Sequence, residues 1–95
     1  KYSVFVNSGS SANLLTINIL KILKGKGEVI VPTLTWISDI SSVLQNNLKP
    51  VFVDILPDSW CLAPDLVEQA ITPRTKAIVA VHLYGNLCEM DKLID

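Results

Sequence analysis

Four short apolar runs, rich in β-branched residues, alternate with longer segments in which apolar residues recur every three or four positions. The short runs predict strands at 2–6, 28–31, 50–55 and 76–83. The longer segments predict helices at 10–24, 36–47, 64–71 and from 89 onward. The predicted order is therefore β-α-β-α-β-α-β-α.

Residues at the predicted boundaries support these elements. Lys21 and Lys24 fall in the last turn of the first helix, where cations interact favourably with the helix dipole, and Gly25 is suited to cap it. Pro32 stops the second strand, and Pro64 suits the first turn of the third helix. The end signals thus agree with the hydrophobic pattern.

The strands are apolar throughout, as expected when both faces of a sheet are covered. Their alternation with helices implies right-handed crossovers and a mainly parallel sheet between two helical layers. We therefore expect an α/β fold of the three-layer αβα type. Such sheets bind ligands outside the carboxyl ends of their strands, which here are the segments that follow Val6, Val31, Ile55 and Leu83.

Composition narrows the functional classes. The 95 residues carry a net charge of −1 and no basic stripe, so we expect no nucleic-acid partner. No apolar run approaches membrane-spanning length and no signal peptide is recognisable, so we expect a cytoplasmic protein without a membrane partner. Cys61 and Cys88 are far apart in sequence and His82 is the single histidine, which excludes the usual Cys/His zinc site. We expect no metal and two free thiols.

The stretch "SGSS", residues 8–11, joins the first strand to the first helix. A helix N-terminus offers unpaired N–H groups and a positive partial charge, Gly9 allows close approach, and Ser10 and Ser11 add hydroxyl donors. These residues are therefore candidates for holding a phosphate. A plain helix cap in a tight turn explains the same residues, and on this feature alone it is the favoured interpretation.

Other candidates follow the predicted strands. Trp36 comes soon after the second strand, where a ring can stack on a flat heterocycle, although core packing is the commoner role of a lone tryptophan. His82, near the end of the fourth strand, suits a pocket residue or general base, but a hydrogen-bonded core histidine is slightly favoured. Asp54 suggests a turn cap more than a pocket group. Asp39 is interpreted as solvated, and Trp60 and Cys61 as turn residues without a visible partner.

The chain resembles the DegT-type sugar aminotransferases, which are fold type I pyridoxal-phosphate enzymes, over essentially its whole length. The resemblance rests on "SGSSAN", "GEVIVPTLTW", "KPVFVDI", "ITPRTKAIVAVHLYG" and "MDKL", which occur in the right order and spacing. The most specific of these are "ITPRTKAI…VHLYG" and "VIVPTLTW". It implies that residues 1–95 are the N-terminal part of a large domain with the fold of a pyridoxal-phosphate-dependent transferase.

The resemblance also implies a cofactor and a reaction. The cofactor is pyridoxal 5'-phosphate; Ser10 and Ser11 hold its phosphate, and Trp36 stacks on its pyridine ring. The parent enzyme moves an amino group from glutamate or glutamine to a nucleotide-linked keto sugar. Members of the family are typically homodimers with sites at the subunit interface, so a homodimer is implied.

The chain departs from the family pattern at two positions. Asn86 stands where glutamine is usual, and Cys61 stands where a polar residue, often asparagine, is usual. The family's carboxylate for the pyridine nitrogen and its Schiff-base lysine belong to regions beyond these residues. No lysine here is placed to substitute for it, because each belongs to a helix end, a strand start or the trailing helix: Lys21, Lys24, Lys26, Lys49, Lys76 and Lys92.

We therefore expect no catalytic residue in this chain and no activity from it alone. Three alternatives stay open. One is a dehydratase relative in which the lysine has been replaced, and another is a binding or regulatory module that keeps the pocket without chemistry. The third is a mononucleotide-binding α/β domain that uses "SGSS" for a nucleotide phosphate.

Overall fold

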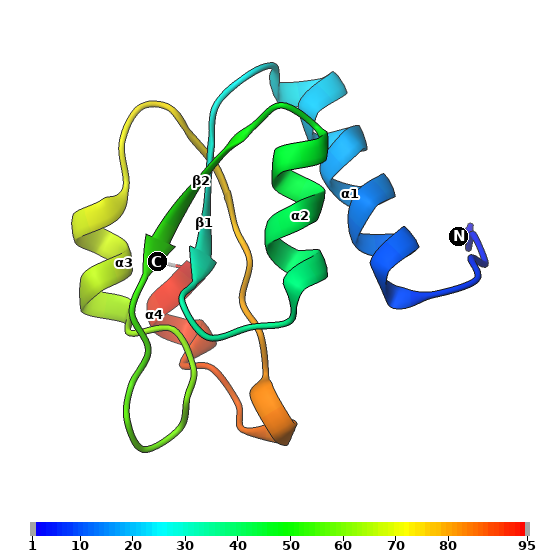
Figure 1. Cartoon of the computed structure of the whole chain (residues 1–95). Coiled ribbons are helices and arrows are strands. Elements are labelled where there is room, and N and C mark those ends of the chain that lie inside the picture. Colours follow the sequence, from blue (N-terminus) through cyan, green and yellow to red (C-terminus); the bar gives the residue numbers. More distant parts are fainter. Residues whose placement is uncertain (1, 95) are drawn as a thin grey trace.

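A parallel three-stranded sheet in the order β2-β1-β3 forms the middle of the molecule (Figure 1). The computed structural model describes residues 2–94. The strands are β1 (Glu28–Pro32), β2 (Lys49–Val53) and β3 (Thr75–Ile78). The central strand, β1, is buried along its whole length, and its Ile30 pairs with Val51 of β2 and Ile78 of β3.

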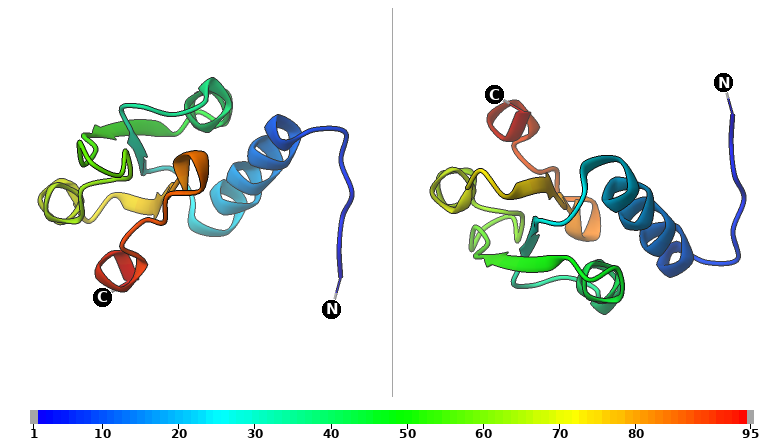
Figure 2. Two further views of the ribbon diagram at one scale, coloured as in Figure 1. Left: turned by 90° about the horizontal axis from the view of Figure 1, so that it is seen from below. Right: turned by 90° about the horizontal axis from the view of Figure 1, so that it is seen from above.

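Helices cover both faces of this sheet, as Figure 2 shows most clearly. The helices are α1 (Gly9–Lys24) and α2 (Ile37–Gln45) on one face, and α3 (Pro64–Ala70) and α4 (Met90–Ile94) on the other. A short 3₁₀ helix, η1 (Leu83–Gly85), follows β3. The predicted three-layer αβα arrangement is confirmed. None of the helices within residues 2–94 has both the length and the apolar character needed to cross a membrane.

The two faces of β1 build two separate cores. Val29 and Val31 point to one face and pack with Ile17 of α1 and Val43 of α2. Ile30 points to the opposite face, where it packs with apolar residues that include Val67 of α3. Successive side chains of a strand alternate between faces, so a strand covered on both sides needs an unbroken apolar run. This explains why β1 could be predicted from sequence.

The predicted strand at 2–6 is wrong. Tyr2, Val4 and Phe5 are 97%, 83% and 99% exposed, and the segment runs away from the sheet beyond the start of α1 (Figures 1 and 2). A segment with high strand propensity forms a strand only where the edge of a neighbouring strand pairs with its backbone hydrogen-bonding groups. Both edges of β1 are occupied by β2 and β3, and among the described residues the segment pairs with neither outer edge of the sheet.

Strand β3 is shorter than the predicted range 76–83. Within residues 2–94 its only partner strand is β1, and the last hydrogen bond beyond the strand runs from the N–H of Val79 to the oxygen of Ile30, at 2.9 Å. After Pro32 the chain turns toward β2, where the N–H of Thr33 donates to the oxygen of Val53, at 3.0 Å. The residues after Val79 therefore have an apolar, strand-like sequence, but among the described residues they pair with no strand.

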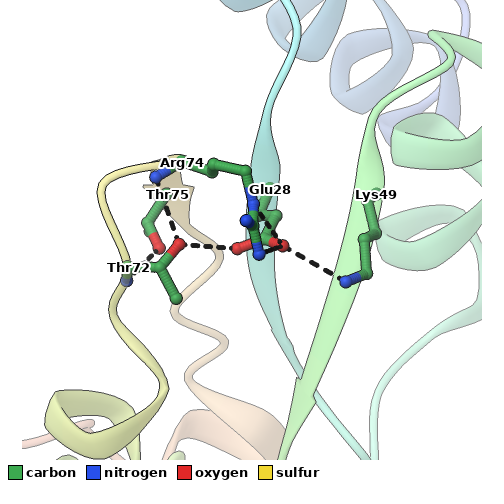
Figure 3. A network of polar contacts seen from close by, with 5 residues as sticks. All are labelled: Glu28, Lys49, Thr72, Arg74 and Thr75. Atoms are coloured by element: carbon green, nitrogen blue, oxygen red, sulfur yellow. Dashed lines mark hydrogen bonds and ion pairs between the residues drawn. The ribbon is translucent and has the colours of Figure 1, made fainter.

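A buried carboxylate ties together the starts of all three strands (Figure 3). Glu28, the first residue of β1, is 3% exposed and accepts hydrogen bonds from Thr72 Oγ1 at 2.8 Å and Arg74 Nη2 at 2.9 Å. Arg74 Nε and Lys49 Nζ also donate to it, at 3.1 and 3.2 Å. The hydrogen bonds from Thr72 and Arg74, followed by the one from Lys49, lower the pKa of Glu28 from 4.5 to about 2.

The residue before this carboxylate must be small. A Cβ on Gly27 would lie 2.5 Å from the carbonyl oxygen of Arg74 and 2.5 Å from Cγ of Lys76. Gly27 also accepts the backbone N–H of Lys49 at 3.0 Å, while Glu28 donates its own N–H to the oxygen of Arg74 at 2.9 Å. The chain segments that enter the three strands are thus held at close backbone distance.

We expect Glu28→Gln to destabilise the full-length protein at neutral pH and to weaken its sensitivity to acid. The folded-state pKa of Glu28 lies near 2, against an ordinary value of 4.5. The stabilisation is therefore complete above pH 4.5 and is lost as the pH falls from 4.5 toward 2. Urea midpoints of parent and variant, measured at several pH values, will converge at the acid end.

The control is Glu68→Gln, the same chemical change at an exposed glutamate of α3. This variant will keep the parent's dependence of the midpoint on pH. If Glu28→Gln also kept it, the buried carboxylate would not be the group that stabilises the strand starts.

Candidate functional site

The carboxyl ends of the parallel strands share one edge of the sheet, at the bottom of Figure 1. The loops that leave β1, β2 and β3 emerge there, and α2 and α1 both begin on the same side. Open parallel sheets bind ligands at this edge, because loops and helix N-termini converge on it. Trp36 therefore follows a strand of this sheet, as predicted, whereas Ser10 and Ser11 lie at the start of α1 without the strand that was predicted before it.

Ser8, rather than Ser10 or Ser11, caps the first helix. Its Oγ accepts the backbone N–H of Ser11 at 3.2 Å, and the hydroxyl of Ser11 donates to Oδ1 of Asn7 at 2.6 Å. The side chain of Ser10 is exposed, and within residues 2–94 neither its hydroxyl nor its N–H has a protein acceptor. Capping explains Ser8, and it leaves Ser10 free for another role.

The start of α1 has room for an anion. A Cβ on Gly9 would meet no atom of the described structure within 4 Å, so internal packing does not require glycine there. Ser10 and Ser11 line a pocket of about 220 Å³, whose opposite wall comes from α2 and includes Ile37 and Ser38. An open helix N-terminus with a free hydroxyl and accessible N–H groups fits the chemistry of a phosphate.

Four polar side chains form a hydrogen-bonded group between the starts of α1 and α2. Asp39 accepts a hydrogen bond from Nδ2 of Asn13 at 2.6 Å and another from the hydroxyl of Thr35, and Asn13 also contacts Oγ of Ser38 at 3.3 Å. Asp39 is half-buried, so the interpretation of this residue as simply solvated is wrong. Because its partner Asn13 lies on another helix, the sequence pattern carries no signal for the pair.

Trp36 is not a core residue in this structure. It directly precedes α2 in an extended backbone conformation, and it is 72% exposed. Its side chain borders an open pocket of about 370 Å³, lined also by Leu34, Thr35, Trp60, Leu83 and Tyr84. The hydrogen bond from Thr35 to Asp39 holds the loop in front of Trp36 against the start of α2. Exposure at this edge leaves the ring available to a ligand.

Trp60 has an aromatic partner, contrary to the sequence-based expectation. Its ring meets Tyr84 edge to face, with centroids 5.8 Å apart and an angle of 70° between the planes. Both residues have positive φ angles, 59° for Trp60 and 53° for Tyr84. The sequence gives no signal for this pair, because the two residues belong to the loops after β2 and β3.

The two positions that depart from the family pattern contact each other. The thiol of Cys61 donates to the carbonyl oxygen of Asn86 at 3.2 Å, and Nδ2 of Asn86 donates to the oxygen of Ser59 at 3.0 Å. Cys61 is buried and has a hydrogen-bond partner, so the expectation of a turn residue without a partner is wrong. Both cysteines are free; burial, together with the neighbouring Cys61, raises the pKa of Cys88.

His82 and Asp54 both stabilise loops. Nδ1 of His82 accepts the backbone N–H of Cys88 at 3.1 Å, but the residue is exposed, so the core position favoured from sequence is wrong while the hydrogen bonding is confirmed. Asp54 accepts the N–H of Ile55 at 2.8 Å and the hydroxyl of Thr33 at 3.1 Å. The turn-capping role of Asp54 is therefore confirmed.

The lysines among residues 2–94 lie away from this edge. Lys49 begins β2 and Lys76 lies near the start of β3, both at the opposite edge of the sheet. Lys21 and Lys24 occupy the last turn of α1, as predicted, and Lys26 follows that helix. Lys92 of α4 pairs with Glu89, the residue that precedes this helix.

A double-mutant cycle tests the link between the two helix starts. We expect Asn13→Ala and Asp39→Ala each to destabilise the full-length protein, with a coupling free energy of about 1 kcal/mol, because a charge-assisted hydrogen bond joins them. Equilibrium unfolding in urea measures the four free energies. The matched control pairs Asp39→Ala with Asn18→Ala, since Asn18 lies on the same helix but bonds Asn46. Additive effects for Asn13 and Asp39 would refute the link.

Known proteins with similar sequences include aminotransferases and a sugar-nucleotide synthase. The profile of the DegT/DnrJ/EryC1/StrS aminotransferase family matches residues 1–95. The chain is 45% identical over 92 residues to an L-glutamine:2-deoxy-scyllo-inosose aminotransferase of Streptomyces kanamyceticus. The aligned region covers 97% of this chain and 21% of that protein. The chain is also 39% identical over 95 residues to the GDP-perosamine synthase of Escherichia coli O157:H7. That alignment covers 100% of this chain and 26% of that protein.

A solved structure agrees with this assignment. Spr1654 of Streptococcus pneumoniae, a proposed sugar aminotransferase known in PLP and PMP forms, superposes with a TM-score of 0.84 and is 40% identical, over 93% of this chain and 22% of that one. The chain thus spans about a quarter or less of the length of the proteins it matches. The match extends over every segment on which the resemblance rested, and the chain belongs to the DegT/DnrJ/EryC1/StrS aminotransferase family.

Proposed function

We propose that residues 1–95 are the N-terminal part of the large domain of a pyridoxal-phosphate-dependent sugar aminotransferase. The parent enzyme transfers an amino group from glutamate or glutamine to a nucleotide-linked keto sugar. Membership of the family supports this proposal, as do relatives named for a glutamine-dependent aminotransferase and for a GDP-sugar synthase. The observation that carries it is the open start of α1 beside the start of α2, at the ligand edge of the sheet.

In this proposal the start of α1 binds the cofactor phosphate. The hydroxyls of Ser10 and Ser11 and the free N–H groups of the first turn donate to its oxygens, and the helix dipole favours its negative charge. Ser11 exchanges its present contact with Asn7 for the phosphate, which a hydroxyl achieves by rotation. When bound, pyridoxal phosphate supplies an electron sink for the transfer of the amino group.

Trp36 supplies the ring-stacking surface. It is exposed, and the helix that it precedes forms the wall opposite Ser10 and Ser11. The contact between Asp39 and Asn13 holds the starts of the two helices in register. One flat, phosphorylated molecule can therefore contact the start of α1 with its phosphate and Trp36 with its ring.

The reacting lysine lies outside this chain in the proposed parent, so these residues bind and orient the cofactor without carrying out the chemistry. The lysines described above lie at the far edge of the sheet or on helix ends, which agrees with this division. The proposed parent is a cytoplasmic homodimer, and the isolated chain is inactive.

The function is tested by the visible absorption spectrum of the full-length protein. We expect a yellow protein whose long-wavelength band disappears on treatment with borohydride, because reduction removes the conjugation between cofactor and lysine. A protein that stays colourless after addition of pyridoxal phosphate would contradict the proposal, and would favour a binding module or a nucleotide site instead.

The phosphate site is tested by the double variant Ser10→Ala/Ser11→Ala. Each hydrogen bond to a charged oxygen contributes about 1.5–3 kcal/mol, so losing both will weaken cofactor affinity by at least about a hundredfold. Titration of cofactor-free, full-length protein with pyridoxal phosphate measures this. Thr16→Ala is the matched control, because it removes a hydroxyl from the same helix about 9 Å further from the start. Unchanged affinity in the double variant would remove the phosphate role from these serines.

A further inference from the structure

We propose that Trp60 and Tyr84 form the binding corner for the neutral six-membered ring of the acceptor substrate. This inference rests on the proposed function, and it assigns the substrate class to the pocket beside Trp36. Its basis is a pocket with three aromatic rings, a strained backbone at two of them, and a set of contacts that joins their two loops.

The pocket has the shape of a corner rather than a slot. The rings of Trp60 and Tyr84 stand at 70° to each other with centroids 5.8 Å apart, next to an open volume of about 370 Å³. Tyr84 is 86% exposed and Trp60 is 45% exposed, so large parts of both rings face solvent. Two aromatic rings that border an open volume at a ligand edge offer apolar surface to a ring-shaped molecule.

Both rings are presented by residues in a left-handed backbone conformation. Only three non-glycine residues among those described have positive φ, and the third is Asn47, a residue type that tolerates it. Bulky aromatic residues tolerate it poorly, and such strain persists only where surrounding contacts impose it. The two strained aromatic residues of the structure are therefore also the two that meet in this pocket.

The surrounding contacts join the two loops on both sides of Trp60. Asn86 donates to the oxygen of Ser59 and accepts from the thiol of Cys61, the residues immediately before and after Trp60. The N–H of Trp60 donates to the oxygen of Leu56 at 2.8 Å. Because Asn86 lies two residues after Tyr84, one side chain and one carbonyl group couple the positions of both rings.

The lining of the pocket selects a neutral ligand. Its six residues are apolar, aromatic or hydroxyl-bearing, and none carries a charge. A carboxylate of the amino donor would require a cation, and a phosphate belongs at the open start of α1. A polyhydroxylated ring in a chair form has C–H groups on its faces for aromatic surface and hydroxyls at its rim for water or polar groups.

The angle between the rings distinguishes a sugar or cyclitol from a nucleobase. A flat base binds best where its face lies parallel to an aromatic ring, whereas a corner offers one face and one edge to a three-dimensional ring. Trp36 borders the same pocket, so a ring in the corner lies next to the residue proposed to stack on the cofactor. This is where an acceptor must lie to receive an amino group.

The test uses the full-length protein loaded with pyridoxal phosphate, and saturation-transfer NMR with two probes. One probe is myo-inositol, a neutral ring that cannot react, and the other is GMP, which carries a base and a phosphate. We expect transfer to the ring protons of myo-inositol in the parent, and binding about tenfold weaker or more in Trp60→Ala and in Tyr84→Gly.

Tyr84→Gly separates binding from folding. Glycine adopts positive φ without strain, so this variant will melt no lower than the parent although it has lost the ring. Trp60→Phe and Tyr84→Phe keep an aromatic surface and will retain most of the binding. Tyr2→Ala is the control, since it removes an exposed aromatic ring from outside the pocket.

The outcomes are distinct. Unchanged binding of myo-inositol in Trp60→Ala and Tyr84→Gly would overturn the inference, and so would a loss confined to the base of GMP. If acrylamide quenched tryptophan fluorescence equally in the parent and in Trp60→Ala, Trp60 would be covered in the full protein. That result would also overturn the inference. A protein without cofactor absorbance that still binds myo-inositol through these rings would refute the reaction and keep the ring site.

Discussion

The arrangement of the sheet depends on a single buried carboxylate. Glu28 lies at the amino ends of the strands, where Thr72, Arg74 and Lys49 bring three chain segments to it. An ionised carboxylate in this position would be costly without partners, and these donors compensate for its loss of water. The hydrogen bonds also set where β2 and β3 begin relative to β1. The positions of the loops at the opposite edge follow from that alignment.

The two edges of the sheet differ in how their polar groups are used. At the amino edge the Glu28 carboxylate accepts hydrogen bonds from Thr72, Arg74 and Lys49, and Gly27 permits backbones to approach closely. At the carboxyl edge the structure keeps free donors at the start of α1, an exposed Trp36 and two aromatic residues in strained conformations. The amino edge, where the polar groups are hydrogen-bonded to each other, stabilises the sheet. The carboxyl edge, with unpaired donors and strained backbone, is suited to binding a ligand.

Sequence reasoning succeeded where local chemistry decides the outcome. The end of α1, with its lysines and Gly25, could be predicted because helix ends depend on adjacent residues. Strand β1 could be predicted because burial on both faces requires an unbroken apolar run. The segment 2–6 has an equally strand-like composition, yet pairing depends on which edges remain free, and one sequence does not state that.

The parts of the site that escaped prediction depend on residues distant in sequence. Asp39 bonds Asn13, 26 positions away, and the ring of Trp60 meets Tyr84 across two loops. The positive φ of these aromatic residues opposes their local preference, so propensity argues against the conformation that the structure adopts. Ser10, Ser11 and Trp36 could be named as candidates because each adjoins a predicted helix start, which is a local feature.

The contact between His82 and the backbone of Cys88 fixes the orientation of the imidazole ring at this edge. Nδ1 accepts that N–H, so a neutral imidazole carries its hydrogen on Nε2. The ring therefore presents a hydrogen-bond donor on its free side, and the same contact that orients it holds residues 82–88 together as one loop.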